Sequence, residues 1–146
     1  MTSSANFGSG DESSSPVSLT KKQVLDRLRR GEGLVEADLR GLDLTGASFD
    51  GCDLSYAKMA ECVLLRCTFR GANLSGASMW QADLRDANFT NANLDDADLD
   101  MANLDGAVLY KAKIRRTLFP LERLPMDRIQ DSIRSGRRLV MDKEAR

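Results

Sequence analysis

A large apolar residue recurs at every fifth position between residues 37 and 116 without interruption. Two positions before each of them stands a small apolar residue, almost always alanine or cysteine, and only Leu42 departs from this second series. A period of five fits neither a strand, whose side chains alternate, nor an α-helix with 3.6 residues per turn. A unit that cannot bury its own apolar face must stack on copies of itself, so the pattern predicts a solenoid. The large series comprises Leu39, Leu44, Phe49, Leu54, Met59, Leu64, Phe69, Leu74, Met79, Leu84, Phe89, Leu94, Leu99, Leu104, Leu109 and Ile114.

The size of one solenoid turn follows from a longer spacing within the repeat. Phenylalanine occupies the large position only at 49, 69 and 89, twenty residues apart. Within the repeats, charged residues separated by twenty are all of opposite sign: Asp38/Lys58, Asp50/Arg70, Arg66/Asp86, Arg85/Asp105, Asp95/Arg115 and Asp96/Arg116. Residues stacked on adjacent rungs lie about 4.8 Å apart and should avoid like charge. We therefore expect four units per turn and about four coils.

Several repeats match a known consensus. Ala72–Gly76, Ala82–Asp86 and Ala92–Asp96 resemble the A-(D/N)-L-x-x motif of pentapeptide repeat proteins, and the resemblance covers about 80 of the 146 residues. It implies an all-β solenoid, specifically a right-handed quadrilateral parallel β-helix. Between Met59 and Phe69 the usual Asp or Asn is replaced, but the inward positions keep their apolar residues.

The segments outside the repeat predict short α-helical caps at both ends. Thr20 and Gln23 have the spacing of a capping box, and an apolar stripe of Val24, Leu25 and Leu28 follows them. The chain accordingly divides into a disordered Ser-rich leader (1–18), an N-terminal capping helix (19–33), the β-helix (34–119) and a C-terminal capping helix and tail (120–146).

The C-terminal segment has two interpretations. Leu118, Phe119, Leu121 and Leu124 are apolar enough to cover the last open coil, and a helix is predicted from Pro125 to Gly136. The segment would then be a cap that protects the solenoid edge. Alternatively, residues 118–141 form a homodimer contact, because some pentapeptide repeat proteins dimerise through C-terminal segments.

The sequence favours binding over catalysis. It contains no histidine, which removes Ser-His and Cys-His nucleophile pairs. The run Asp96–Asp100 resembles a calcium loop, but Met101 stands where that loop needs glycine. The three cysteines occupy the small position and are predicted to be buried: Cys52, Cys62 and Cys67. We therefore expect no enzymatic activity, no cofactor and no metal site.

One candidate binding surface is acidic. Aspartates crowd the third and fourth predicted coils: Asp83, Asp86, Asp95, Asp96, Asp98, Asp100 and Asp105. The family resemblance suggests imitation of DNA toward a type II topoisomerase such as gyrase. Four coils would span only about 19 Å, so such a mimic would need to be a dimer. Alternatively, the aspartates only keep the surface soluble.

The other candidate surface is apolar. In the four-sided register Val63, Leu65, Trp80 and Met101 point outward, with Ala60 nearby, where most outward positions are polar. A cluster of this kind that contains tryptophan is typical of protein contact, although a terminal segment could also cover it.

The favoured interpretation is thus a non-enzymatic protein-binding or scaffold module that presents a rigid β-helix face to another protein. The alternatives are a topoisomerase-binding dimer and an exported effector, the latter suggested by the Ser-rich leader.

No apolar run approaches the length of a membrane span, and the first residues lack the pattern of a secretory signal. We expect a cytoplasmic protein, or a secreted one if it is an effector. Residues 110–146 carry eleven basic and five acidic side chains, interpreted as a solvated helix, so direct nucleic-acid binding is not expected.

Overall fold

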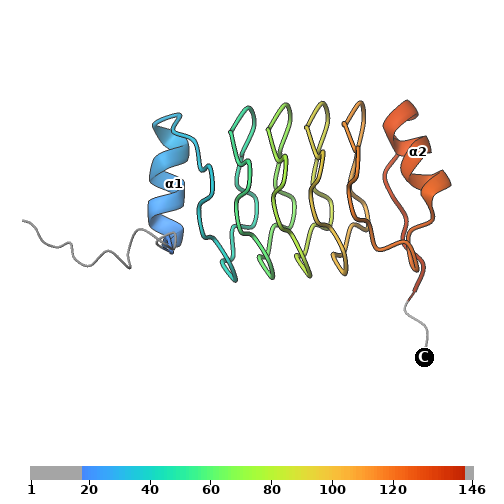
Figure 1. Ribbon diagram of the computed structural model, residues 1–146, viewed down its shortest axis with the longest axis horizontal. Helices are drawn as coiled ribbons and strands as arrows, with labels where there is room; N and C mark the ends of the chain where they lie inside the picture. The colour runs from blue at the N-terminus through green and yellow to red at the C-terminus, as the bar shows by residue number, and fades with distance from the viewer. Residues whose placement is uncertain (1–17, 144–146) are drawn as a thin grey trace, which may run out of the picture.

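The computed structural model describes residues 18–143 and has the shape of a rod (Figure 1). Helix α1, Lys21–Arg29, lies at one end and helix α2, Met126–Ser135, lies at the other. Between them the repeat region winds in successive coils side by side along the long axis. Apart from Ser18, the leader predicted over residues 1–18 lies outside the described residues.

Pairing between coils joins residues that are twenty apart. Isolated parallel bridges run from Ser18↔Asp38 to Asp98↔Leu118, always with this separation. The phenylalanine spacing is thereby confirmed: the Phe49 and Phe69 rings stack with centroids 5.0 Å apart, and Phe69 and Phe89 repeat this geometry. Each side of a coil contributes a single bridged residue, because a turn follows at once.

The turns have a uniform backbone. The N–H of the small residue donates to the carbonyl of the large residue three positions earlier, as from Ala57 to Leu54 at 3.0 Å. The residue just before the small one has positive φ at every fifth position from 36 to 116, as in a type II turn. Six of these positions hold glycine, for example Gly41 at φ 75°. Eleven of these positions nevertheless carry another residue type, including Tyr56 and Met101.

The interior consists of the two apolar series. The large side chains from Leu39 to Leu109 are fully buried, whereas Ile114 on the last coil is only half-buried. Cys62 and Cys67 are buried, as predicted, and their thiols donate to the carbonyls of Leu39 and Leu44 at 2.9 Å. Burial raises the pKa of both thiols to about 11.

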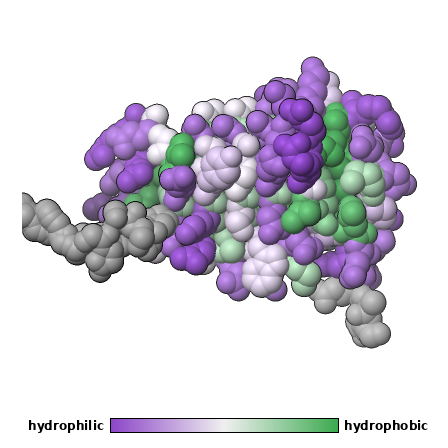
Figure 2. All heavy atoms as spheres, viewed as in Figure 1, coloured by the Kyte–Doolittle hydropathy of each residue, from purple (hydrophilic) through white to green (hydrophobic). Residues whose placement is uncertain are grey.

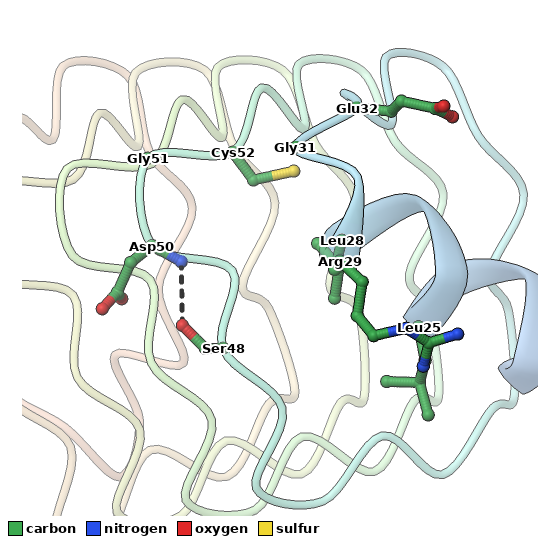
Figure 3. Close-up of a pocket in the computed structure, with 9 residues that line it drawn as sticks. All are labelled: Leu25, Leu28, Arg29, Gly31, Glu32, Ser48, Asp50, Gly51 and Cys52. Atoms are coloured by element: carbon green, nitrogen blue, oxygen red, sulfur yellow. Dashed lines mark hydrogen bonds between the residues drawn. The ribbon is translucent and has the colours of Figure 1, made fainter.

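Helix α1 closes the N-terminal end with one buried side chain. Thr20 and Gln23 form the predicted capping box, with backbone-to-side-chain hydrogen bonds of 2.8 and 3.2 Å. Val24 is fully buried and stands twenty residues before Leu44, so the inward register continues into the helix. Between α1 and the 48–52 segment lies a hollow of about 500 Å³, seen in Figure 3. Cys52 lines this hollow and is therefore only half-buried, contrary to the sequence prediction.

The C-terminal end is closed by hydrogen bonds. In earlier coils the N–H of a large residue donates to a carbonyl nineteen positions later, as from Leu84 to Asn103 at 2.8 Å. On the last coil, four N–H groups that lack a further coil find other acceptors. Leu104 donates to Met141 Sδ at 3.1 Å, Gly106 to the Leu139 carbonyl at 2.7 Å, Leu109 to Ser132 Oγ at 3.0 Å and Lys111 to the Ile133 carbonyl at 3.0 Å.

Candidate functional site

The structure divides the four predicted apolar residues into two pairs. Trp80 is 39% exposed and Met101 is 60% exposed, whereas Val63 and Leu65 are only half-buried. Val63 and Leu65 flank the inward Leu64 on one side of the coil. Trp80 and Met101 follow the inward Met79 and Leu99 on the preceding side of the coil. Because Trp80 and Met101 are the more exposed, this pair offers the larger apolar area to a partner.

Two further apolar residues extend this surface. Leu118 is 57% exposed and Leu121 is 52% exposed. The prediction that both cover the last coil is wrong, because Phe119 and Leu124 occupy the interior there. Leu118 bridges Asp98 and therefore holds an outward position, and Leu121 falls at the next corner in the five-residue count. Continuing that count through residue 121 would have placed both side chains outside.

We refer to Trp80, Met101, Leu118 and Leu121 as the Trp80 surface. All four flank the same column of inward residues, Met79, Leu99 and Phe119, on consecutive rungs. Met101 also has φ 63°, a conformation that costs a residue with a Cβ about 1 kcal/mol or more. Because its side chain is mostly exposed, folding gains little from methionine at this corner.

Figure 2 shows the hydropathy of one face of the rod. Hydrophilic side chains dominate this view, and hydrophobic ones gather toward the end that carries α2. Exposed apolar residues are indeed concentrated in this part of the chain, where Met126 and Val140 are exposed in addition to Leu118 and Leu121. The apolar surface that remains open thus lies near the C-terminal closure.

Arginines neutralise much of the predicted acidic surface. Arg115 and Arg116 pair with Asp95 and Asp96 across one rung, at 3.4 and 2.6 Å, as the twenty-residue spacing predicts. The Arg116 guanidinium lowers the pKa of Asp96. Asp86 instead pairs with Arg138 of the C-terminal segment, with 3.5 Å between Nη1 and Oδ1.

Other arginines pair within their own repeat. Arg85 forms a bidentate ion pair with Asp83, with hydrogen bonds of 2.8 and 2.7 Å, rather than an ion pair with Asp105. Arg40 binds Asp38 in the same way, at 2.9 and 2.7 Å. These hydrogen bonds lower the pKa of both aspartates. Residues i and i+2 project to the same side of an extended strand, so the arginine reaches its neighbour without crossing a rung.

Three of the predicted acidic residues have no ion pair within residues 18–143, namely Asp98, Asp100 and Asp105. Asp105 accepts a hydrogen bond from the Met141 N–H at 3.0 Å. Asp98 and Asp100 accept the N–H groups of Asp100 and Met101 at 2.9 and 3.0 Å. Since both belong to the coil of Met101, this part of the acidic surface coincides with the Trp80 surface.

Within residues 18–143 no three His, Cys, Asp or Glu side chains are grouped so that they could hold a metal ion. The thiol pKa is raised at Cys52 as well, chiefly by burial, so this cysteine is less ionised than an exposed one. None of the helices in the same range is long and apolar enough to cross a membrane.

Solved structures of similar fold come from plants and cyanobacteria. A pentapeptide repeat protein from the thylakoid lumen of Arabidopsis thaliana is 35% identical, with a TM-score of 0.54 over 55% of each chain. One from the cyanobacterium Cyanothece 51142 is 32% identical, with a TM-score of 0.56 over 57% of this chain and 56% of its own. A third, from Nostoc PCC 7120, is 36% identical, with a TM-score of 0.46 over 66% of this chain and 82% of its own. The chain thus matches little more than half the length of the first two.

A comparison with family models gives the same assignment. The model described as the pentapeptide repeat region matches residues 42–120, which is more than half of the chain. No curated protein matches the sequence. The matched residues include most of the bridged residues and the stacked phenylalanines. The chain therefore belongs to the pentapeptide repeat family.

Proposed function

We propose that this chain is a non-enzymatic protein-binding module that presents the Trp80 surface to another protein. Its frame would be the right-handed quadrilateral β-helix of about four coils that family membership implies. The observation that carries the proposal is the exposure of Trp80 and Met101 beside the same inward column, 39% and 60% respectively. Exposed tryptophan in an apolar cluster is characteristic of interface hot spots.

The side chains of this surface contribute little to the fold itself. Positions equivalent to Trp80 on other rungs hold Arg40, Ala60 and Asp100, so the coil does not require an aromatic residue there. Met101 occupies a corner where glycine or asparagine would be less strained. Apolar residues at both positions are therefore more readily explained by contact than by folding.

Two alternatives receive less support from the side chains. A DNA mimic needs free carboxylates, yet four of the seven predicted aspartates are paired with arginine. A homodimer through residues 118–141 needs exposed apolar area there, yet Phe119, Leu124 and Leu139 are buried within the chain. Leu118, Leu121, Met126 and Val140 of this segment remain exposed, so a homodimer through it would use the C-terminal part of the Trp80 surface.

The proposal can be tested by photocrosslinking in the source cell lysate. A photoreactive amino acid replaces Gln81 in one variant and Asn91 in another; both are exposed corner residues, with φ 58° and 61°, but only Gln81 adjoins Trp80. We expect a defined crosslinked protein from position 81 that is absent from position 91. Adding Trp80→Ser should abolish it, whereas Tyr56→Asn, at an exposed aromatic elsewhere, should not. Equal crosslinking from both positions, or a product insensitive to Trp80→Ser, would contradict the proposal.

A further inference from the structure

Unpaired carboxylates flank the Trp80 surface. Glu61, Asp98 and Asp100 form no ion pair within residues 18–143. Asp100 occupies the position twenty residues after Trp80 and precedes Met101, and Asp98 bridges Leu118. Glu61 is exposed, and its N–H donates to the Trp80 carbonyl at 2.8 Å. All three acids therefore stand within one rung of an exposed apolar residue.

The nearby arginines pair with other aspartates and so do not neutralise these three carboxylates. On the adjacent sides of the coil, Asp83 pairs with Arg85 at 2.7 Å and Asp95 pairs with Arg115 at 3.4 Å. In the column of Asp98, Lys58 is separated from it by Ser78, which bridges both residues. Glu122, beside Leu121, is exposed and adds another negative charge at this edge. Glu61, Asp98 and Asp100 thus carry charges beside the apolar surface that no Lys or Arg of residues 18–143 pairs within 4.0 Å.

We propose that the occupant of the Trp80 surface is a segment of another protein in which a large apolar side chain is flanked by lysine or arginine. This inference rests on the function proposed above. The apolar side chain would pack on Trp80 and Met101, where burial of apolar area drives association. The flanking cations would meet Glu61, Asp98 and Asp100, and one of them could also lie over the Trp80 ring. Charge complementarity of this kind selects the partner and speeds its encounter.

The segment after helix α2 is one part of the chain with this chemistry. Arg137, Arg138 and the exposed Val140 follow helix α2, so a second copy could compete for the same surface. Arg138 already contacts Asp86 and the Gly106 carbonyl, and Leu139 is buried under the last coil. These internal contacts favour a different protein as the occupant.

The charges can be removed without disturbing the frame. Asn73, Asn93 and Asn103 occupy the position of Asp98 in other repeats, and their Oδ1 atoms accept the N–H two residues later at 2.9–3.1 Å. Asp98→Asn therefore keeps the hydrogen bond and loses only the charge. The test variant is Glu61→Gln/Asp98→Asn/Asp100→Asn. Its matched control, Glu36→Gln/Asp43→Asn/Asp53→Asn, removes three carboxylates that also form no ion pair within residues 18–143 but lie near the opposite end.

The probe is a library of random dodecapeptides displayed on phage and selected on the immobilised full chain. Selected peptides are synthesised and their affinities measured by fluorescence anisotropy. We expect sequences in which a large apolar residue is flanked by lysine or arginine, with binding abolished by Trp80→Ser. The test triple variant should weaken binding about tenfold, and the control triple variant should leave it within about twofold.

The other outcomes separate this inference from the proposed function. Peptides that require Trp80 but lack basic residues, and that bind the test triple variant normally, would overturn the inference and leave the function standing. Peptides insensitive to Trp80→Ser, or no selected peptides at all, would count against both. A dimer detected by light scattering and dissociated by Trp80→Ser would show that the occupant is a second copy and would overturn the inference.

Discussion

The two ends of the rod are closed in physically different ways. At the C-terminal end, four N–H groups of the last coil bond to Met141, Leu139, Ser132 and Ile133, so two sides of the edge are satisfied. At the N-terminal end, helix α1 contributes the buried Val24 but little hydrogen bonding. The N–H groups of Asp43, Ser48 and Asp53 have no acceptor within residues 18–143, although their equivalents one coil later donate to Leu42, Ala47 and Cys52 at 2.9–3.1 Å.

This difference shows what a helix can and cannot supply as a cap. A helix uses its own backbone groups internally, so it can cover an apolar end but cannot pair with a strand edge. The extended segment after α2 can do both, because Leu139 both accepts from Gly106 and donates to Ala107, at 2.7 and 2.8 Å. Edge strands left unpaired are sites where other chains add. The C-terminal closure is accordingly expected to be the more stable of the two.

The largest expected effect is at Leu139. Leu139→Ala removes a fully packed side chain from the C-terminal closure and should cost about 3 kcal/mol of unfolding free energy, measured by urea denaturation. Val140→Ala, at an exposed neighbour, is the control and should change stability by less than about 0.5 kcal/mol. A cost for Leu139→Ala below about 1 kcal/mol would mean that the C-terminal segment is not an integral cap.

The second effect isolates a hydrogen bond at the same end. Ser132 is buried and its Oγ accepts the Leu109 N–H at 3.0 Å. Ser132→Ala leaves that donor buried without a partner and should cost about 2 kcal/mol. The exposed Ser135 on the same helix provides the control substitution, Ser135→Ala, with a smaller expected loss. Equal losses at both positions would argue that helix propensity, rather than the satisfied edge, sets the stability of this closure.

The third effect tests the weaker end. Val24→Ala removes two buried methyl groups and should cost about 1.5 kcal/mol. Since solenoid units are stabilised mainly by their neighbours, the loss should appear as local opening of α1. Hydrogen exchange should therefore accelerate at Leu25 and Leu28 while the amides of Phe69 and Phe89 stay protected. Uniform acceleration along the rod would show that the two ends are not independent.

The interior of the repeat was predictable because each inward position follows from a strict period. The register followed as well, since the phenylalanines at 49, 69 and 89 stack as their spacing requires. The pairing of Leu139 with the last coil was not predictable, because residues after Ile114 carry no period that fixes a partner. The non-glycine corners were also missed: Tyr56 and Met101 have positive φ although their intrinsic preference opposes it.

The candidate surface was predicted only in part. Trp80 and Met101 were identified because they break a polar outward pattern, and both are exposed. Leu118 and Leu121 were predicted to cover the last open coil because of their hydrophobicity, although the five-residue count places both outside. Charge pairing was predictable only in part: of six pairs at a separation of twenty, Asp95/Arg115 and Asp96/Arg116 form ion pairs, and partners two residues apart, such as Asp83 and Arg85, were not predicted.

The smallest expected effect concerns the start of α1. The Thr20 side chain accepts the Gln23 N–H at 3.2 Å, and Gln23 returns the bond to the Thr20 N–H at 2.8 Å. Thr20→Ala should cost about 1 kcal/mol of helix stability, whereas Thr20→Ser retains the acceptor and should cost little. Hydrogen exchange at α1 measures both variants. Because α1 is bound chiefly through Val24, loss of the cap should fray its first turn without opening the coil beneath, so protection at Leu44 should be unchanged. Loss of that protection would mean that α1 seals the N-terminal edge more tightly than its hydrogen bonds indicate.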